Sequence, residues 1–280
     1  MPLPFTRELK VQSPLQAGDD VKIAQTLLNR NPAVAPTLVV DGYFGDNSAR
    51  GVQQFQNSVN FKVTGILDDA TARKLLELHS ADGFKDPGFT AASKGYLYKL
   101  YVPVHVNRSI ETTAILFDKD NNELLRFIAR THGYRDDGTT GAWPDFGTGD
   151  VGLNEFTDNG MTVTGLMELD LNSPEPSAAA YGPWPVNRFV RGLDGNALLL
   201  VPNIRDGILL HTGNWSTASR PWDSSMPMPN SAGCVHAHPE DGEAIYKILV
   251  GLGVKVNDNT FSGKNYPYKP QGLAVVELVE

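Results

Sequence analysis

The spacing of apolar residues changes once along this chain of 280 residues, and the change divides the chain into two parts. Between residues 15 and 80 apolar residues recur every three or four positions, which is typical of helices that bury one face. From residue 95 onward, short runs rich in Val, Ile, Leu and aromatic residues indicate half-buried strands. The pattern therefore predicts an α+β protein with two domains: a small three-helix domain, then a mainly β domain with one helix near its end.

The boundaries of these parts follow from composition. Gly, Ala, Asp and Ser are frequent in residues 81–94, which is typical of a flexible linker. We predict a tail over residues 1–14, the helical domain over 15–80, the linker over 81–94, the β domain over 95–258 and a C-terminal extension over 259–280.

Within the β domain, the pattern predicts strands at residues 96–102, 112–118, 124–130, 197–201 and 207–211. A helix that begins at Pro239 and a strand at 254–256 follow, and the last apolar run, 273–279, could add an edge strand. Stretches rich in Gly, Asp and Pro, at 133–160 and 172–187, are predicted to form surface loops around a site.

Overall composition excludes some classes of function. A net charge of −8 and a pI near 5.3 argue against binding to nucleic acid or to anionic membranes. No apolar run is long enough to span a bilayer, and the N-terminal residues lack the continuous apolar region of a secretory signal peptide. We therefore expect no transmembrane segment, and the route of any export stays open. A single cysteine excludes an internal disulfide.

That cysteine, Cys234, is the strongest candidate for chemistry. A thiolate nucleophile needs a base, and His211 lies upstream at the end of a predicted strand. Ala232 and Gly233 are small and leave the thiol open to a carbonyl group. A helix starting at Pro239 would place its N-terminus near the cysteine and favour both thiolate and oxyanion. The alternative is a buried structural cysteine near an unrelated histidine.

The order of these parts resembles the catalytic domain of the YkuD-type L,D-transpeptidases of bacterial cell walls. His211 and Gly213 match the histidine-glycine turn of that family, and its cysteine signature is matched by Ser231, Gly233, Cys234 and Val235. Two positions differ from the signature: Ala232 replaces a histidine, and His236 stands where Asn or Arg is usual. The loop between His211 and Ser231 has 19 residues, which is long for the family.

The resemblance implies a role for each matching residue. Cys234 would attack the carbonyl between an L-centre and a terminal D-amino acid of a peptidoglycan stem peptide, with His211 as the base. The Thr212 carbonyl would orient the imidazole. Ser231 and the amides near Gly233 would order the oxyanion site, and the remaining candidates, for substrate binding, are Gly213, His236 and Trp215. Trp215 could instead pack its own loop.

Residues 15–80 resemble the type 1 peptidoglycan-binding domains. The matching motifs are Leu15-Gln-Ala-Gly18, Gln25-x-Leu-Leu-Asn29, Val40-Asp-Gly-x-Phe-Gly45, Phe55-Gln56 and Thr64-Gly-x-Leu-Asp68. Two glycine-containing loops in this segment are weak echoes of one another. Gly42, Gly45 and Gly65 are better explained as turn residues than as ligand contacts, so no individual binding residue is predicted here.

Several functional hypotheses remain open at this point. Transfer of the acyl group to an amine would cross-link the wall, whereas transfer to water would make the protein an L,D-carboxypeptidase, possible also in an antibacterial effector. A non-catalytic wall-binding protein is a further alternative. A zinc site is another, because Cys234, His236 and His238 alternate and His211 could complete four ligands. We expect no cofactor, a monomer with peptidoglycan as its partner, and a location in the cell wall, the periplasm or outside the cell.

Overall fold

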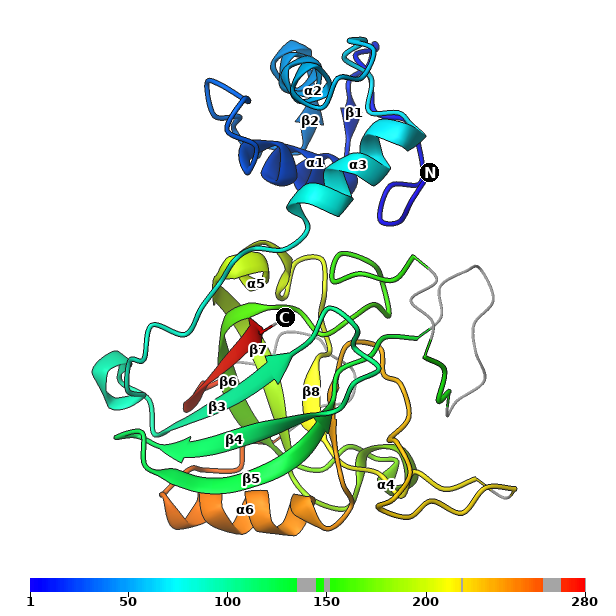
Figure 1. The fold of residues 1–280 in the computed structure, drawn as a ribbon. Coiled ribbons are helices and arrows are strands. Elements are labelled where there is room, and N and C mark those ends of the chain that lie inside the picture. The colour runs from blue at the N-terminus through cyan, green and yellow to red at the C-terminus, as the bar shows by residue number, and fades with distance from the viewer. Residues whose placement is uncertain (135–144, 149–151, 218, 259–267, 280) are drawn as a thin grey trace. The chain divides into compact units, whose positions relative to one another are not determined.

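The computed structural model describes residues 1–134, 145–148, 152–217, 219–258 and 268–279. The chain divides into two compact units, Met1–Asp82 and Gly83–Glu280 (Figure 1). The first is helical and the second is mainly β, which confirms the predicted fold class. Among the described residues, no helix is both long enough and apolar enough to cross a membrane.

Unit 1 is a three-helix domain with a short β ribbon. Its helices are α1 (Asp19–Asn29), α2 (Asp46–Ser58) and α3 (Asp69–His79), and its ribbon pairs β1 (Gln16–Ala17) with β2 (Tyr43–Phe44). Apolar side chains from all three helices fill the core, among them Leu27, Phe55 and Leu75. Asp68 caps α3 by accepting a hydrogen bond from the Thr71 amide.

The first fourteen residues, predicted to be a tail, are part of unit 1. Phe5 and Leu9 are fully buried, and Leu9 forms an antiparallel bridge with Leu67. Arg7 also pairs with Asp20 at the start of α1. The apolar residues here are too widely spaced to show a period, which is why the sequence pattern missed their burial.

Two buried glutamines hold the two glycine turns of unit 1. The Gln25 side-chain oxygen accepts the Gly42 amide, and its nitrogen donates to Asp41, Ser48 and the Tyr43 carbonyl. Gln56 repeats the arrangement, because its oxygen accepts the amides of Thr64 and Gly65 while its nitrogen donates to the Ile66 carbonyl. The two loops that resemble each other in sequence are therefore held by the same pattern of hydrogen bonds.

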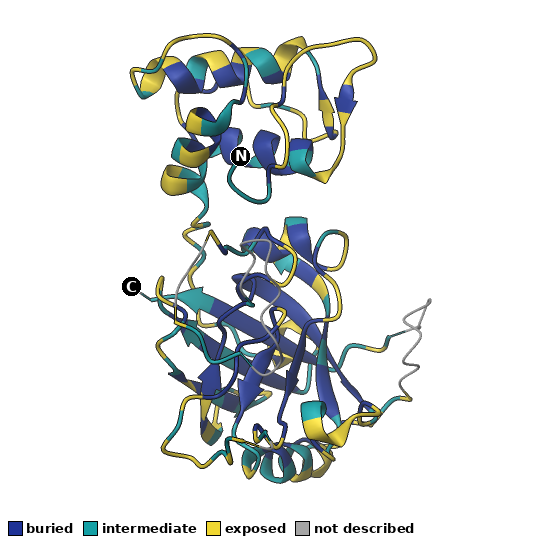
Figure 2. Ribbon diagram, turned by 90° about the vertical axis from the view of Figure 1, so that its right-hand side faces the viewer, coloured by how far each residue is buried: buried dark blue, intermediate teal, exposed yellow. Residues whose placement is uncertain are grey.

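Unit 2 is built on a closed barrel with the strand order β10-β3-β4-β5-β9-β8-β7-β6. The strands are β3 (Tyr98–Val104), β4 (Thr112–Asp118), β5 (Glu123–Arg130), β6 (Gly165–Asn172), β7 (Val186–Asp194), β8 (Leu209–His211), β9 (Val235–Ala237) and β10 (Gly272–Leu278). The pairs β10–β3 and β8–β9 are parallel, and the other pairs are antiparallel. Most of the strand residues are buried (Figure 2).

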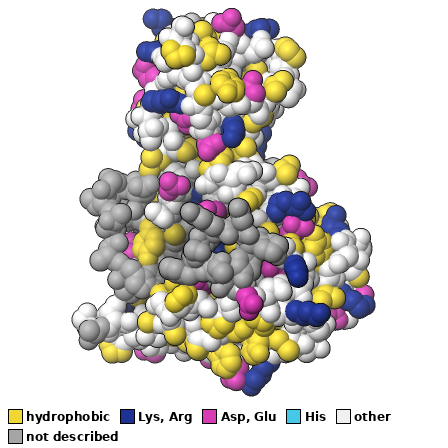
Figure 3. Space-filling model, turned by 180° about the vertical axis from the view of Figure 1, so that it is seen from behind, with side chains coloured by type: hydrophobic (Ala, Val, Ile, Leu, Met, Phe, Trp, Pro, Cys, Tyr) yellow, Lys and Arg dark blue, Asp and Glu magenta, His cyan; other side chains and the backbone are white. Residues whose placement is uncertain are grey.

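Short helices flank the barrel. They are the 3-10 helix η1 (Ala92–Lys94), α4 (Ala178–Tyr181), α5 (Gly195–Leu200) and α6 (Asp241–Gly251). The helix α6 runs along β5 in Figure 1. On the face shown in Figure 3, acidic and basic side chains are interspersed on both units, and neither sign gathers into a patch outside the grey atoms.

Two strand predictions are wrong, and a third strand is present but not in its predicted place. Residues 197–201 lie mostly in α5, where Asp194 accepts the Gly195 amide, because a short apolar run does not distinguish helix from strand. Residues 254–256 are not in a strand, and only Asn257 forms a bridge, with Asn172. The run at 273–279 supplies β10, which lies between β3 and β6 and is therefore not an edge strand.

Residues 84–89 of the predicted linker are packed on unit 2. Phe84 and Phe89 contact a core cluster of the barrel. Lys99, with 2% of its surface exposed, bonds both Asp86 and the Phe89 carbonyl. A buried cation must be paired, so this contact fixes residues 84–89 on the barrel. The flexible linker is therefore shorter than the fourteen residues expected from composition.

Candidate active site

The parallel pair of β8 and β9 brings the predicted base and nucleophile together. His211 is in register with His236, and Leu210 with Val235, so Cys234 lies beside Leu209 at the start of β9. His211 and Cys234 line one cavity of about 240 Å³, with His236, Ser231 and Ala232. The chain segments that meet here are more than twenty residues apart in sequence, and the barrel pairing is what joins them.

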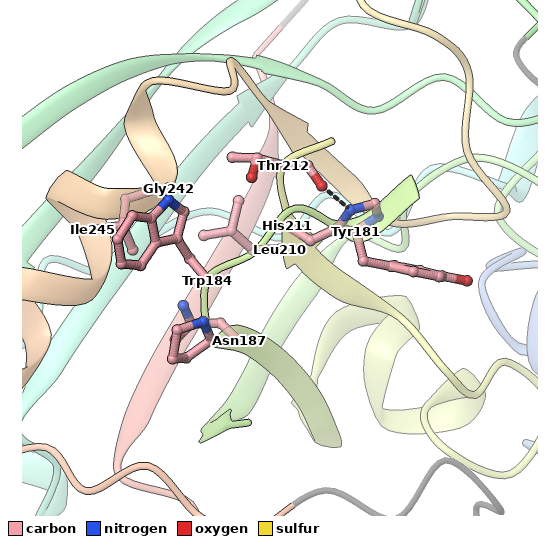
Figure 4. A pocket seen from close by; sticks show the side chains of 9 residues that line it. Tyr181, Trp184, Asn187, Leu210, His211, Thr212, Gly242 and Ile245 are labelled. Atoms are coloured by element: carbon pink, nitrogen blue, oxygen red, sulfur yellow. Dashed lines mark hydrogen bonds between the residues drawn. The ribbon is translucent and has the colours of Figure 1, made fainter. Parts of the chain in front are cut away.

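The His211 ring is held in one orientation. Its Nδ1 lies 2.8 Å from the Thr212 carbonyl oxygen, so we assign the proton to Nδ1, which leaves Nε2 free to accept a proton (Figure 4). Burial lowers the pKa of His211 to about 4, and the bond to Thr212 opposes that shift in part. The imidazole is therefore neutral near pH 7, as a general base must be.

The Cys234 thiol is buried, with 8% of the residue exposed. Burial raises its pKa to about 11, whereas a hydrogen bond from the Leu209 amide and the charges of Arg188 and Arg205 act in the opposite direction. The resting pair is therefore a thiol and a neutral imidazole. Burial of both groups disfavours the ion pair until a substrate supplies a partner for the charge.

The thiol does not point at the imidazole in this structure. Its Sγ donates to the Gly207 carbonyl over 3.7 Å, and among the described residues it makes no hydrogen bond to His211. Both side chains border the same cavity, and rotation about the Cα–Cβ bond of Cys234 changes the direction of the thiol. Apo geometries of this kind are compatible with catalysis, because such bonds commonly tighten when substrate binds.

The loop before the cysteine is fixed by Ser231. The Ser231 hydroxyl donates to the Cys234 carbonyl over 2.7 Å and accepts the Gly233 amide over 3.1 Å. The Gly233 amide, expected to face an oxyanion, is thus already engaged. In the described part of the chain the Cys234 amide has no hydrogen-bond partner, which leaves it as the available donor.

The expected helix dipole does not act at the cysteine. The strand β9 follows Cys234, and α6 begins only at Asp241, so Pro239 is not in its first turn. The influence of a helix dipole is confined to its first turn. The prediction failed because the short run Val235–Ala237 pairs with β8 and β5, and such long-range pairing leaves no local signal in the sequence.

His236 and Trp215 form a stack behind the base. Their rings are 4.4 Å apart, the His236 and His211 rings are 4.6 Å apart, and His236 Nδ1 lies 2.8 Å from the Pro229 carbonyl. Trp215 is 1% exposed and donates to the Ala237 carbonyl, so it packs within the protein, as its alternative role requires, and its contact with substrate stays a prediction.

Gly213 has a packing role in this arrangement. A side chain at this position would collide with the Trp215 ring and with the Ala180 carbonyl, so the position admits only glycine. Gly213 does not border the cavity that holds the thiol, unlike His236. Of the three residues predicted to bind substrate, His236 alone lines that cavity.

Two tyrosines that line the cavity, Tyr134 and Tyr181, are not among the residues predicted from the sequence. Burial and the nearby Cys234 raise the pKa of both phenols, so both are neutral donors at pH 7. They come from the stretches 133–160 and 172–187, which the sequence predicted to be loops around a site. Parts of the first stretch, 135–144 and 149–151, lie outside the described residues.

The alternative zinc site is not assembled by these residues. His238 packs edge-on against Trp222 and lies 3.6 Å from Glu240, while His236 is bound to the Pro229 carbonyl. In the part of the chain with described coordinates, no three His, Cys, Asp or Glu side chains are grouped to hold a metal. The geometry brings together a thiol, a base, a free amide and two phenols.

Comparisons with known proteins agree with both sequence resemblances. Residues 17–75 match the peptidoglycan binding domain family, and residues 112–259 match the L,D-transpeptidase catalytic domain family. None of the curated proteins matches the chain.

Solved structures that resemble the chain do so remotely. An L,D-transpeptidase from Xylanimonas cellulosilytica is 13% identical, with 98% of this chain and 100% of that chain covered and a TM-score of 0.29. An L,D-transpeptidase from Stackebrandtia nassauensis is also 13% identical, with 97% of each chain covered and a TM-score of 0.31. These TM-scores are too low to support an argument.

Proposed function

Because the chain belongs to the L,D-transpeptidase catalytic domain family, we propose that Cys234 is the nucleophile of an acyl transfer on peptidoglycan stem peptides, with His211 as its base. The observation that carries this proposal is the placement of the two side chains at one cavity, with the imidazole fixed on the Thr212 carbonyl. The peptidoglycan binding domain in the same chain gives the cell wall as the context of the reaction.

The first half-reaction forms a thioester. The Cys234 proton passes to His211 Nε2 while the sulfur attacks the carbonyl carbon between the L-centre and the terminal D-amino acid. The Cys234 amide binds the oxyanion that forms. His211 then returns the proton to the leaving amine, the C–N bond breaks, and D-alanine departs. Because the resting pair is neutral, proton transfer accompanies the attack and does not precede it.

The second half-reaction depends on the acceptor. An amine of another stem peptide gives a cross-link, and water gives a shortened stem peptide. Ala232 is exposed and lines the cavity beside the thiol, where the family signature has a histidine. A small side chain leaves the thioester open to water, which favours L,D-carboxypeptidase activity as the second candidate function.

The test uses purified stem tetrapeptides and mass spectrometry. The wild-type protein should release D-alanine and yield cross-linked dimers or tripeptides, whereas Cys234→Ala and His211→Asn should release none above background. His238→Ala is the matched control, because His238 packs on Trp222 outside the cavity, and it should keep wild-type turnover. A carbapenem should add its mass to the wild-type protein and not to Cys234→Ala.

The same experiment decides against the proposal if the wild-type protein behaves like Cys234→Ala in every assay. The non-catalytic wall-binding alternative would then stand. We further propose that the protein acts as a monomer in the wall, the periplasm or the extracellular space. An effector role predicts that expression directed to the periplasm is toxic while cytoplasmic expression is harmless, and equal growth in the two cases argues against it.

A further inference from the structure

A buried guanidinium lies under the loop that carries the cysteine. Arg205, with 3% of its surface exposed, donates from Nη1 to the carbonyls of Glu155 and Met161, at 2.5 and 3.2 Å. Its Nη2 donates to the carbonyls of Gly160 and Ala232, each at 3.2 Å. All four acceptors are backbone carbonyls. One of them, that of Ala232, belongs to the loop Ser231–Cys234, called the nucleophile loop below.

This guanidinium forms no ion pair with any carboxylate that the structure describes. Within the described residues no Asp or Glu oxygen lies within ion-pair distance of Arg205, whereas the buried Arg108 pairs with Glu155 at 2.6 Å. Arginine stays charged in proteins, and a buried charge without a counter-charge is costly. The dipoles of four carbonyls offset that cost in part, and burial still lowers the Arg205 pKa. A neutral side chain could make similar hydrogen bonds, so the charge itself needs an explanation.

The guanidinium is in contact with the nucleophile loop. A Cβ at Gly233 would overlap Arg205 Nη2, so the absence of a side chain at Gly233 is what admits the arginine. Gly233 has φ of +106°, a conformation that glycine adopts without strain. The Ala232–Cys234 backbone is therefore held both by Arg205, through the Ala232 carbonyl, and by the Ser231 hydroxyl, through the Cys234 carbonyl.

The segment around Arg205 also touches the sulfur. Gly207, two residues along the chain, supplies the carbonyl that accepts the Cys234 thiol. One short connection between α5 and β8 thus sets both the backbone of the nucleophile loop and the resting direction of the thiol.

We infer that Arg205 is a positioning residue that fixes the Ala232–Cys234 backbone and keeps a buried positive charge near Cys234, where it stabilises the negative charge that develops on the sulfur during attack. The inference rests on the proposed function for its catalytic consequence. Its effect on the thiol is independent of any substrate.

The direction of the electrostatic effects agrees with this role. The charge of Arg205 acts to lower the pKa of Cys234. Burial lowers the pKa of Arg205 itself, and the nearby Glu155, Asp158 and then Cys234 act against that shift. Arg188 acts on Cys234 in the same direction, but its guanidinium binds Glu175 at 2.6 Å, and that carboxylate raises the thiol pKa. Arg205 is the cation near the sulfur whose charge is not offset by an ion pair within the described residues.

The test measures thiol reactivity and turnover in the full-length protein. Because Cys234 is the only cysteine, the iodoacetamide adduct measured by intact mass reports on this thiol alone. In Arg205→Met the alkylation rate between pH 7 and 9 should fall about tenfold, with the rise in rate displaced by about one unit to higher pH. The kcat on a soluble tetrapeptide should fall at least as far, with KM within about twofold.

Two further variants separate charge from structure. Arg205→Lys keeps the charge with fewer donors and should alkylate within about threefold of the wild type while kcat is reduced. Arg191→Met removes a guanidinium that binds Glu168 away from the cavity and should leave the alkylation profile unchanged. If Arg205→Met does not fold, Arg205→Gln, which keeps hydrogen-bond donors and removes the charge, takes its place in the comparison with Arg205→Lys.

Equal alkylation rates in wild type and folded Arg205→Met would overturn the inference. So would equal losses in Arg205→Met and Arg205→Lys, because the charge would then be irrelevant. If the wild-type protein turns over no stem peptide but the variants still change alkylation as expected, the proposed function fails and the coupling of Arg205 to the thiol stands.

Discussion

The two units hold their glycine-containing loops with different chemistry. In unit 1, neutral glutamines bind both amides and carbonyls of the turns at Gly42 and Gly65. In unit 2, the loop at Gly233 is held by a cation, Arg205, whose hydrogen bonds within the described residues go to backbone carbonyls. All three anchoring side chains are buried and make several hydrogen bonds to backbone.

The difference shows what each loop has to do. A neutral amide carries little desolvation penalty once its hydrogen bonds are made, so it is sufficient where a turn only has to be held. A buried charge costs more, and its compensation is greatest next to a group that becomes negative. The charged anchor occurs beside the thiol, and the neutral anchors occur in the unit that has no nucleophile.

The largest effect on turnover is expected from adding a side chain at Gly233, which contacts Arg205 and precedes Cys234. Gly233→Ala would press Cβ against Arg205 Nη2 and strain a residue with φ of +106°. Because four carbonyls hold the guanidinium, the loop must move, and a displacement near 1 Å can lower kcat about 100-fold. Turnover of a soluble tetrapeptide measures this loss.

Gly65→Ala is the matched change in unit 1. Gly65 has φ of +74°, and a Cβ there would lie 3.1 Å from the flexible Gln53 side chain. We expect a loss of about 1 kcal/mol in unfolding free energy and unchanged turnover. If Gly233→Ala keeps wild-type turnover, the nucleophile loop is not held as described.

Acid should lower the stability of unit 2 through its buried histidines. His211 and His236 are buried in unit 2, and burial lowers the pKa of His211 to about 4 and that of His236 well below its usual value. Between the unfolded value near 6.5 and about 4, the unfolded chain binds more protons, so unit 2 loses stability as pH falls through this window. His211 alone accounts for about 3 kcal/mol.

The four tryptophans make this loss measurable, because every one of them lies in unit 2. Urea unfolding followed by tryptophan fluorescence at pH 7 and pH 4.5 should show the loss, and His211→Asn should reduce it. Turnover should fall over the same acidic pH range, since a protonated imidazole cannot accept the thiol proton. Identical urea midpoints at the two pH values would contradict the burial of neutral histidines.

A smaller effect is expected from removing a neutral anchor. Gln56→Leu leaves the amides of Thr64 and Gly65 and the Ile66 carbonyl without their partner. Unit 1 should lose about 2 kcal/mol, measured by helical circular dichroism, and Gln53→Leu on the exposed face of α2 is the control. Cys234 alkylation should not change, in contrast to Arg205→Met. A change in alkylation would show that the two anchors are not independent.

The features predicted correctly from the sequence are those that a local pattern or a motif determines. Helical spacing predicted the helices of unit 1. The motif around Cys234 led to the predicted nucleophile and base, whose roles stay predictions, and to the Thr212 contact, which the structure contains. The position of β10 was missed because pairing with β3 and β6 joins residues more than a hundred positions apart. Arg205 was missed because nothing local marks an arginine as buried. Tyr134 and Tyr181 had only the loop prediction to indicate them.

Removal of unit 1 is expected to change turnover of a soluble substrate very little. A chain that begins at Gly83 keeps Phe84, Phe89 and the Asp86 partner of Lys99, so the barrel retains its anchored segment. Turnover of a soluble tetrapeptide should stay within about twofold of the full-length protein, while binding to insoluble sacculi should be lost, since the local concentration of substrate comes from the binding domain.

A chain that begins at Gly95 is the contrasting variant. It leaves Lys99 buried without Asp86, and we expect a lower melting temperature and lower turnover. If the chain from Gly83 is folded by tryptophan fluorescence yet inactive on the soluble peptide, unit 1 contributes to the active site and the division of labour between the units is wrong.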